Sequence, residues 1–321
     1  MSKPLLSVSG LGISTVQDPR TLVNSVSFEI MPGEAVGVVG ESGSGKTLTA
    51  LSILGLLPRG VAVAGGSIDF NGTDLTKADP ETMRNLRGLD ISMVYQDPMT
   101  ALNPVMKLGR QLLEVIESHE KLDNSSIARV EAALREVGIP QVERAMESYP
   151  HEFSGGMRQR VMIAMALLLS PKLLIADEPT TALDVTIQQQ ILALVSEQRR
   201  KRDMSMLWIT HDLGVVANLV DRLIVMYAGN IVEAGTVQEI FTNPQHPYTH
   251  GLLSSLPSRT DKSRKRLTSI PGVPQKPWLV GNTCAFAPRC FKATSECTAS
   301  APKLVGTLEK SVACVHPMGD K

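Results

Sequence analysis

The sequence predicts an α/β fold centred on a parallel sheet with helices on both of its faces. Two short runs, 34–40 (EAVGVVG) and 173–177 (LLIAD), are largely apolar, which is typical of strands buried on both faces of a sheet. From residue 172 to residue 229, runs of this kind alternate with helical patterns, as in sheets whose strands are joined by crossover helices. With 321 residues, the chain is long enough to bury such a core.

Three further regions flank or interrupt this sheet. Alternating apolar and polar residues at 5–14 and 25–30 predict strands of an antiparallel β subdomain. Helical periodicity dominates from about 98 to 170, which predicts an inserted α-helical subdomain. After about residue 255, prolines become dense and the alternation of strand and helix stops. We therefore predict a nucleotide-binding domain at 1–255, for the reasons given below, and an irregular, cysteine-rich extension at 256–321.

The composition is that of an ordinary globular protein without a large basic surface. Hydrophobic residues make up 43% and charged residues 20%, and 32 Lys and Arg balance 32 Asp and Glu. Because a balanced chain offers no strong field to nucleic acid, we expect no nucleic-acid partner. We expect no signal peptide, and the longest apolar run, 161–169, is far shorter than the ~20 residues that span a bilayer. A cytosolic chain that meets membranes only through partners is expected.

A glycine-rich loop predicts nucleotide binding. Residues 40–47 read GESGSGKT, which matches the pattern G-x-x-x-x-G-K-[ST] between a predicted strand and a predicted helix. In such a loop the backbone N–H groups surround phosphate oxygens. Lys46 can reach the β- and γ-phosphates, and the Thr47 hydroxyl can bind Mg²⁺. The predicted nucleotide-binding residues of the loop are Gly40, Glu41, Ser42, Gly43, Ser44, Gly45, Lys46 and Thr47.

Two adjacent carboxylates narrow the class of nucleotide enzyme. Asp177 emerges at the carboxyl end of the predicted strand 173–177, where open α/β sheets bind their ligands, and it suits Mg²⁺ directly or through water. Glu178 follows and could orient or deprotonate a water molecule that attacks the γ-phosphate. We therefore predict that the site hydrolyses its nucleotide.

A second anion-binding helix start precedes this strand. In FSGGM (153–157), Ser154 is a good N-cap, and Gly155 and Gly156 expose backbone N–H groups where an apolar helix begins. One chain thus carries two phosphate-type sites. The simplest arrangement is two subunits head to tail, each lending its Ser-Gly-Gly helix to the nucleotide of the other. A small-molecule kinase would share the glycine-rich loop but would leave FSGGM unexplained.

Taken in order, GESGSGKT, YQD, FSGGM, LLIADEP, TALD and ITHD resemble the motifs of ATP-binding subunits of ABC transporters, over residues 1 to about 255. The resemblance implies ATP as the nucleotide. It implies that Gln96 contacts Mg²⁺ or the attacking water, that Asp184 lies at the dimer seam, and that His211 hydrogen-bonds the γ-phosphate.

The sequence departs from this family at two places. Residues 11–27 contain no aromatic residue, although the family places a ring there to stack on adenine. We therefore expect that recognition of the base is either weak or supplied by an aliphatic contact from a residue such as Leu22. The signature FSGGM has Phe and Met where the family has Leu and Gln, but Ser154 and both glycines are present. With Glu178 also present, we expect a subunit that is competent in hydrolysis.

Finer features resemble the branch of the family that imports dipeptides and oligopeptides, on 96–104 (QDPMTALNP), 169–188 and 243–257 (NPQHPYTHGLLSSLP). The resemblance implies an ATPase that powers peptide import by closing as a dimer on ATP and reopening after hydrolysis. From the residues alone, HPYT is a proline-containing helix start without an assigned role. Nickel, glutathione or oligosaccharide as cargo stays open, as does a soluble ABC ATPase that acts on ribosomes or DNA.

The same resemblance implies partners and a location. A second, homologous ATPase subunit, expected in a heterodimer, would complete the pair of nucleotide sites. Two transmembrane permease subunits would carry the cargo, and an extracytoplasmic substrate-binding protein would act with them indirectly. The chain would then be bound peripherally at the cytoplasmic face of the membrane, through the permease subunits.

Four cysteines cluster near the end of a chain that has no others: Cys284, Cys290, Cys297 and Cys314. In a cytosolic chain such a cluster favours a metal or cluster site over disulfides. The spacing lacks the close C-x2–4-C pair of structural zinc sites and suits a larger cluster held by four thiolates. Some members of the peptide-import branch, which this segment resembles, carry an iron–sulfur cluster there. We expect a 4Fe–4S cluster, with zinc, disulfides or no metal as alternatives.

Overall fold

The computed structural model describes residues 3–181, 183–256 and 269–319, and the chain forms two compact units. The predicted helical subdomain at about 98–170 lies inside the second unit. The predicted domain boundary at 255 adjoins residues 257–268, which lie outside the described residues. The first unit comprises Met1–Ile30, Ala35–Lys77 and Trp208–Lys321, and the second comprises Met31–Glu34 and Ala78–Leu207.

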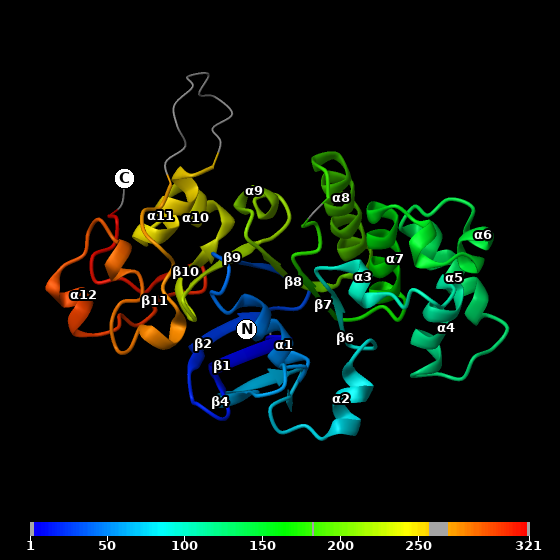
Figure 1. The fold of residues 1–321 in the computed structure, drawn as a ribbon, viewed down its shortest axis with the longest axis horizontal. Coiled ribbons are helices and arrows are strands. Elements are labelled where there is room, and N and C mark those ends of the chain that lie inside the picture. Colours follow the sequence, from blue (N-terminus) through cyan, green and yellow to red (C-terminus); the bar gives the residue numbers. More distant parts are fainter. Residues whose placement is uncertain (1–2, 182, 257–268, 320–321) are drawn as a thin grey trace, which may run out of the picture. The chain divides into compact units, whose positions relative to one another are not determined.

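An antiparallel sheet begins the first unit, with the strand order β2-β1-β4-β5 (Figure 1). On β1, Leu6 pairs with Ile30 on one side and with Phe70 on the other, and all three side chains are buried. Alternate residues of these strands face the core, so the predicted antiparallel strands are confirmed. The strands are β1 (Leu6–Thr15), β2 (Thr21–Ile30), β4 (Val61–Phe70) and β5 (Thr73–Asp74).

A second sheet in the first unit has the order β11-β12-β10-β9-β3. Its strands β3 and β9 are parallel, with Val36 opposite Arg222, and β3 is buried along its whole length. Strand β10 returns antiparallel to β9 through a tight turn at Ala228 and Gly229, both of which have positive φ. The sheet is therefore mixed, not wholly parallel as predicted. The strands are β3 (Ala35–Val39), β9 (Arg222–Tyr227), β10 (Asn230–Thr236), β11 (Val305–Gly306) and β12 (Lys310–Val312).

The last part of the chain is less irregular than predicted. Strand β12 pairs antiparallel with β10, for example Val312 with Glu233, and so extends the sheet of the first unit. Figure 1 shows the C-terminal residues, orange to red, beside α10, α11 and β10. The segment thus packs on the unit that contains the phosphate loop. The helices of this unit are α1 (Lys46–Ile53), α9 (Leu213–Val216), α10 (Val237–Thr242), α11 (Pro247–Ser254), α12 (Ser295–Ala299) and the 3-10 turns η2 (Pro277–Leu279) and η3 (Ala287–Arg289).

The second unit combines two buried parallel strands with the helical subdomain. Strand β6 pairs parallel with β7, with Ile91 opposite Leu173, and every residue of both strands is buried. Helices α4, α5, α6 and α7 form a cluster (Figure 1). Strand β8 (Ser205–Thr210) begins in this unit and ends in the first. The other elements are α2 (Pro80–Leu86), β6 (Ile91–Val94), α3 (Pro98–Ala101), α4 (Leu108–Glu117), α5 (Ser126–Glu136), α6 (Val142–Glu147), η1 (Pro150–Glu152), α7 (Gly155–Leu167), β7 (Leu173–Asp177) and α8 (Val185–Arg202).

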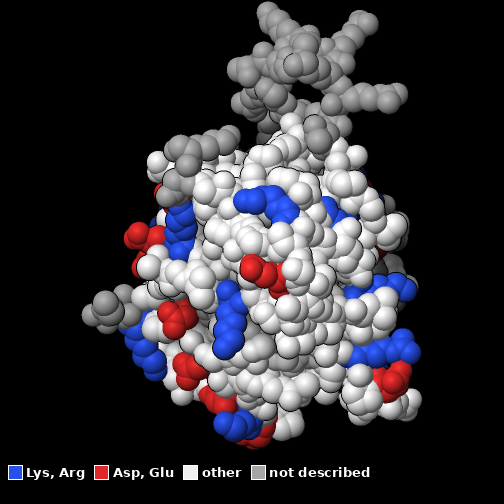
Figure 2. Space-filling model, turned by 90° about the vertical axis from the view of Figure 1, so that its left-hand side faces the viewer, with Lys and Arg blue, Asp and Glu red and all other residues white. Residues whose placement is uncertain are grey.

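Charged side chains of both signs are spread over the face seen in Figure 2, with some blue and red side chains next to one another and uncharged ones between the groups. This agrees with the balanced numbers of cationic and anionic residues in the sequence. Within the described residues, no helix combines the length and the apolar character needed to cross a membrane.

Candidate functional site

Residues 40–47 join the buried strand β3 to helix α1, as predicted from the sequence. Gly40 must be glycine, because its φ is 153° and a Cβ there would lie 2.1 Å from the carbonyl oxygen of Met226. Gly43 and Gly45 have φ values of 78° and 99°, in the region that glycine adopts most easily. The chain can therefore curl tightly, and the positive end of helix α1 adjoins the loop.

Lys46 and Ser44 are the buried polar residues of the loop. The Lys46 ammonium donates hydrogen bonds to the carbonyl oxygens of Gly40, at 2.8 Å, and Glu41, at 3.0 Å. Among the described residues, Ser44 Oγ has no hydrogen-bond partner although it is buried. A buried hydroxyl without a partner indicates that a ligand or water satisfies it. The loop thus offers a cation and an unused polar group to an anionic ligand.

The acidic pair lies in the second unit, at the end of β7. Asp177 is the last, buried residue of the strand, and the half-buried Glu178 follows with a φ of 45°. A residue other than glycine in this left-handed region is uncommon, and such residues cluster at functional sites. Glu178 Oε2 accepts hydrogen bonds from Gln96 Nε2 at 3.4 Å and from Thr181 Oγ1 at 3.1 Å. The structure therefore brings Gln96 and Glu178 together.

Two helix starts meet in the same unit. Ser154 Oγ accepts the N–H of Met157 at 3.3 Å and so caps α7, as predicted. Asp184 caps α8 in the same way, with Oδ1 accepting the N–H of Ile187 at 2.9 Å. A Cβ at Gly156 would lie 2.8 Å from Ile187 Cγ2, so the starts of α7 and α8 pack against each other. Two positive helix ends thus lie side by side.

The remaining predicted residues of the nucleotide site lie in the first unit. Thr47 is exposed in the first turn of α1, and the exposed His211 directly follows β8. Leu22 is half-buried on β2, and its carbonyl oxygen lies 3.3 Å from where a Cβ of Gly45 would be. Strand β2 therefore passes beside the phosphate loop.

Two residues that the sequence reasoning did not single out contact the phosphate loop. The hydroxyl of the fully buried Tyr248 accepts the N–H of Glu41 at 2.9 Å, and Arg289 forms an ion pair with the Glu41 carboxylate at 2.7 Å. Tyr248 belongs to the HPYT segment, and the resemblance of this segment to peptide importers is the sequence feature that could have indicated a role for it. Arg289 had no such signal, because its partner lies 248 residues earlier in the chain.

The four predicted cluster ligands are free thiols. Burial raises the pKa of Cys284, Cys290 and Cys314, and charge interactions with neighbouring cysteines raise each further. Within the described residues, however, no group of three or more His, Cys, Asp or Glu side chains is placed to hold a metal ion. The thiols are neighbours, but they are not arranged as a ligand set, so the predicted cluster receives no support from their geometry.

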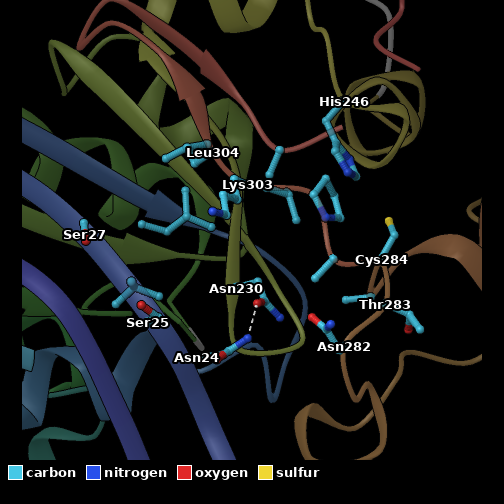
Figure 3. Close-up of a pocket in the computed structure, with 17 residues that line it drawn as sticks. Asn24, Ser25, Ser27, Asn230, His246, Asn282, Thr283, Cys284, Lys303 and Leu304 are labelled. Carbon is cyan, nitrogen blue, oxygen red and sulfur yellow. Dashed lines mark hydrogen bonds between the residues drawn. The ribbon is translucent and has the colours of Figure 1, made fainter. Parts of the chain in front are cut away.

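A cavity of about 490 Å³ lies between β2, the start of β10 and the C-terminal segment (Figure 3). Cys284 and His246 line it, and Asn24 Nδ2 donates a hydrogen bond to Asn230 Oδ1 at 3.0 Å. Residues 40–47 do not line this cavity, so we assign it no part in binding nucleotide.

A phosphate loop by itself also fits a kinase or a GTPase, but the paired helix starts at Ser154 and Asp184 would be unexplained in those enzymes. The molecule is an ATPase of the ABC class. Residues 23–181 match the family described as ABC transporter, and residues 232–297 match the family described as Oligopeptide/dipeptide transporter, C-terminal region. This chain belongs to the ATP-binding proteins of the oligopeptide and dipeptide ABC transporters.

Among its relatives is the oligopeptide transport ATP-binding protein OppD of Bacillus subtilis, 52% identical over 274 residues, or 84% of this chain and 76% of the relative. The dipeptide transport ATP-binding protein DppD of the same organism is 51% identical over 290 residues, or 89% of this chain and 86% of the relative. OppD of Escherichia coli is 44% identical over 317 residues, or 98% of this chain and 94% of the relative.

Solved structures share the fold. CbiO1 of Clostridium perfringens, part of the ABC transporter complex cbiONQ, has a TM-score of 0.65 and 26% identity, over 75% of this chain and 92% of its own. The ATP-binding cassette MJ0796, in a dimeric post-hydrolysis state with ADP and phosphate, has a TM-score of 0.65 over 72% of this chain and 98% of its own. At 23% identity, the second likeness shows the fold alone.

Proposed function

We propose that this chain is the ATP-hydrolysing subunit that powers the import of dipeptides or oligopeptides through an ABC transporter. The main structural support is the hydrogen bond between Gln96 and Glu178, at 3.4 Å. The same chain has a tightly curled loop in which Lys46 donates a hydrogen bond to the carbonyl oxygen of Gly40. The cargo follows from relatives that are named for oligopeptide and dipeptide transport.

The predicted residues divide the work of binding and hydrolysis between them in this proposal. Residues 40–47 bind the triphosphate, and Lys46 neutralises its β- and γ-phosphates. Glu178 acts as the general base on the attacking water, and Gln96 orients the same water. The γ-phosphate accepts a hydrogen bond from His211. Hydrolysis then needs no covalent intermediate, because positioning and electrostatics lower the barrier.

Mg²⁺ is the metal that this chemistry requires. Thr47, Gln96 and Asp177 offer hydroxyl, amide and carboxylate oxygens, which are the donors that Mg²⁺ prefers. When bound, the ion neutralises charge on the β- and γ-phosphates. Thr47 lies in the first turn of α1, Gln96 follows β6, and Asp177 ends β7. The donor chemistry therefore fits Mg²⁺.

Ser154, Gly155, Gly156 and Asp184 act across a dimer in this proposal. The helix start at Ser154, Gly155 and Gly156 contacts the γ-phosphate of ATP held by a second, homologous ATPase subunit, Asp184 lies at the seam of the dimer, and binding closes the pair. Hydrolysis removes the bridging anion, so the pair reopens. Two permease subunits convert closure into transport and hold this chain peripherally at the cytoplasmic face, and a substrate-binding protein delivers the peptide. A heterodimer is the arrangement that we propose.

Reconstituted transport tests this function. The chain is purified with its partner ATPase and permease subunits, placed in liposomes, and assayed for ATP-dependent uptake of labelled dipeptides and oligopeptides. We expect ATPase activity that depends on the permeases and is lost in Lys46→Ala. ATPase activity that ignores the permeases would contradict the transport role. Uptake of nickel, glutathione or oligosaccharide instead of peptide would show that the transporter imports that cargo and not peptides.

For the last part of the chain we propose a C-terminal extension at 256–321 that follows a nucleotide-binding domain at 1–255 and binds a 4Fe–4S cluster, with zinc as the alternative. The support for a shared site is that all four cysteines of the sequence, at 284, 290, 297 and 314, lie within about 30 residues of one another. Anaerobic purification followed by iron, sulfide and zinc analysis tests it, with a broad visible absorption band expected. A colourless, metal-free chain would refute the proposal, and stoichiometric zinc would select the alternative.

A further inference from the structure

Arg289 and Glu41 form a two-point ion pair in the first unit. Arg289 Nη1 lies 2.7 Å from Glu41 Oε2, and Arg289 Nη2 lies 3.1 Å from Glu41 Oε1. The Arg289 side chain is 4% exposed and that of Glu41 is 25% exposed. A paired contact of this kind fixes the orientation of both planar groups as well as their distance. Because Glu41 is the second residue of the phosphate loop, the contact fixes part of the loop.

Arg289 is itself held firmly. Its Nε donates to the carbonyl oxygen of Pro271 at 2.8 Å, and its Nη1 also donates to the Tyr227 hydroxyl at 3.2 Å. The guanidinium carbon lies 5.7 Å from the ring centroid of Tyr227 and 5.9 Å from that of Phe286. Burial lowers the pKa of Arg289, but hydrogen bonds to Glu41 and Tyr227 outweigh this effect and raise it. The side chain is therefore a fixed cation.

Two more contacts from the C-terminal part of the chain hold the backbone of the loop. The Tyr248 hydroxyl accepts the N–H of Glu41, and the N–H of Gly229 donates to the carbonyl oxygen of Ser44 at 3.0 Å. The loop is thus tied at Glu41 through both side chain and backbone, and again at Ser44. A loop that must direct its N–H groups at phosphate binds more tightly when this shape exists beforehand.

The turn that carries Arg289 also carries two of the cysteines. The N–H of Ala287 donates to the carbonyl oxygen of Cys284 at 3.1 Å, and the N–H of Cys290 donates to that of Ala287 at 3.2 Å. Arg289 therefore lies within a tight turn that has a thiol at each end. A displacement of this turn would move the guanidinium away from Glu41.

We propose that Arg289 is a positioning residue for ATP, through which the C-terminal segment holds the phosphate loop in its binding shape. The inference rests on the proposed function, because it requires that this loop binds ATP. Arg289 acts through Glu41 and not on the nucleotide itself. ATP affinity then depends on a segment 248 residues further along the chain.

The test is Arg289→Gln in the full chain. Binding of a fluorescent ATP analogue is measured on the chain, and ATPase kinetics are measured on the assembled transporter. We expect the Kd and the KM for ATP to rise about tenfold, the effect of losing a charge-assisted hydrogen bond, while kcat at saturating ATP changes little. Glu41→Gln should raise the Kd and the KM for ATP by a similar factor. The double variant should bind ATP no more weakly than either single variant.

Arg222→Gln is the matched control. Arg222 is also buried and donates to the carbonyl oxygen of Glu29 at 2.7 Å, but it lies at the start of β9, away from the loop. The Arg222→Gln variant should have a lower Tm than the unaltered protein, and its affinity for ATP should be unchanged at temperatures well below that Tm.

An Arg289→Gln chain that loses only Tm and binds ATP like the unaltered protein would overturn the inference. Effects that add up in the double variant would overturn it as well. If Arg289→Gln does not fold, Arg289→Lys replaces it, with an intermediate loss of affinity expected and unchanged affinity overturning the inference. Failure of the proposed function is distinguishable in both of its parts. If the chain is not an ATPase, the unaltered chain binds no ATP, and if only the transport role fails, ATP binding by the unaltered chain and the comparison with Arg289→Gln stay as expected.

Discussion

Gln96 and Glu178 are 82 residues apart in the sequence, and the Gln96 side chain donates a hydrogen bond to the Glu178 carboxylate at 3.4 Å. Thr181 donates a second hydrogen bond to the same oxygen, at 3.1 Å. Both donors bind the same oxygen, Oε2, and so favour one orientation of the Glu178 carboxylate, which would suit a general base. Gln96 and Glu178, which were predicted from two separate motifs, therefore belong to one cluster of side chains.

Glu178→Gln should abolish turnover without loss of ATP binding. The amide keeps the size and the hydrogen-bonding capacity of the side chain but cannot accept the proton of the attacking water. We expect kcat to fall by at least ~100-fold, the usual contribution of a general base, and the ATP-bound dimer to persist. Steady-state ATPase assays and retention of nucleotide on a sizing column measure the two effects. Normal hydrolysis would exclude Glu178 as the base.

The two glycines of the Ser-Gly-Gly segment should respond differently to alanine. A Cβ at Gly156 would meet Ile187 Cγ2 at 2.8 Å, whereas a Cβ at Gly155 would have Leu183 Cδ2 at an ordinary 3.9 Å. We therefore expect Gly156→Ala to lower the free energy of unfolding by about 1–3 kcal/mol, the usual effect of overpacking. Gly155→Ala should leave it unchanged or raise it slightly, since alanine favours helix. Urea unfolding of both variants, followed by circular dichroism, makes the comparison, and equal losses would contradict the packing argument.

The sequence was most informative where structure depends on neighbours in the chain. The apolar run before Gly40 and the glycines after it predicted a buried strand and a phosphate loop, because local backbone freedom decides both. The pairing of Val312 with Glu233 and the ion pair of Arg289 with Glu41 were not predicted. Each of these contacts joins segments that are far apart in the chain. The sequence around one residue of such a pair does not indicate which distant residue it will contact. Likewise, the cysteine spacing suggested a ligand set, but spacing does not fix the directions of the thiols.

Recognition of the adenine base should depend on aliphatic contact at β2. Leu22 lies beside Gly45, and no aromatic residue occurs in 11–27. We expect Leu22→Ala to weaken ATP binding by up to about 50-fold, the loss of three buried carbon groups at about 0.8 kcal/mol each, and to leave the binding of inorganic tripolyphosphate unchanged. Competition against a fluorescent ATP analogue measures both ligands. Equal weakening of both would mean that Leu22 supports the phosphate loop and does not contact the base.

The start of α11 contains a buried histidine whose protonation should control acid stability. His246 is 1% exposed, its ring Nδ1 accepts the backbone N–H of Tyr248 at 3.1 Å, and the backbone N–H of His246 donates to Glu233 Oε2 at 2.9 Å. Burial lowers the pKa of His246 to about 3 from an ordinary value of 6.5. Between these two values the unfolded chain binds a proton that the folded chain does not, so stability falls as the pH falls.

His246→Asn should remove this part of the acid sensitivity. Asparagine is a good N-cap that can still accept the N–H of Tyr248, but it does not titrate. The unaltered protein should lose up to about 1.4 kcal/mol for each pH unit below 6.5 from this group, and the variant should not. Burial raises the pKa of Glu233, which contributes a slope of the opposite sign to both proteins, so it cancels in the comparison. Urea midpoints at intervals from pH 7.5 to pH 5, values chosen to bracket the ordinary histidine pKa of about 6.5, provide the test. Parallel curves for the two proteins would show that His246 does not set the acid limit.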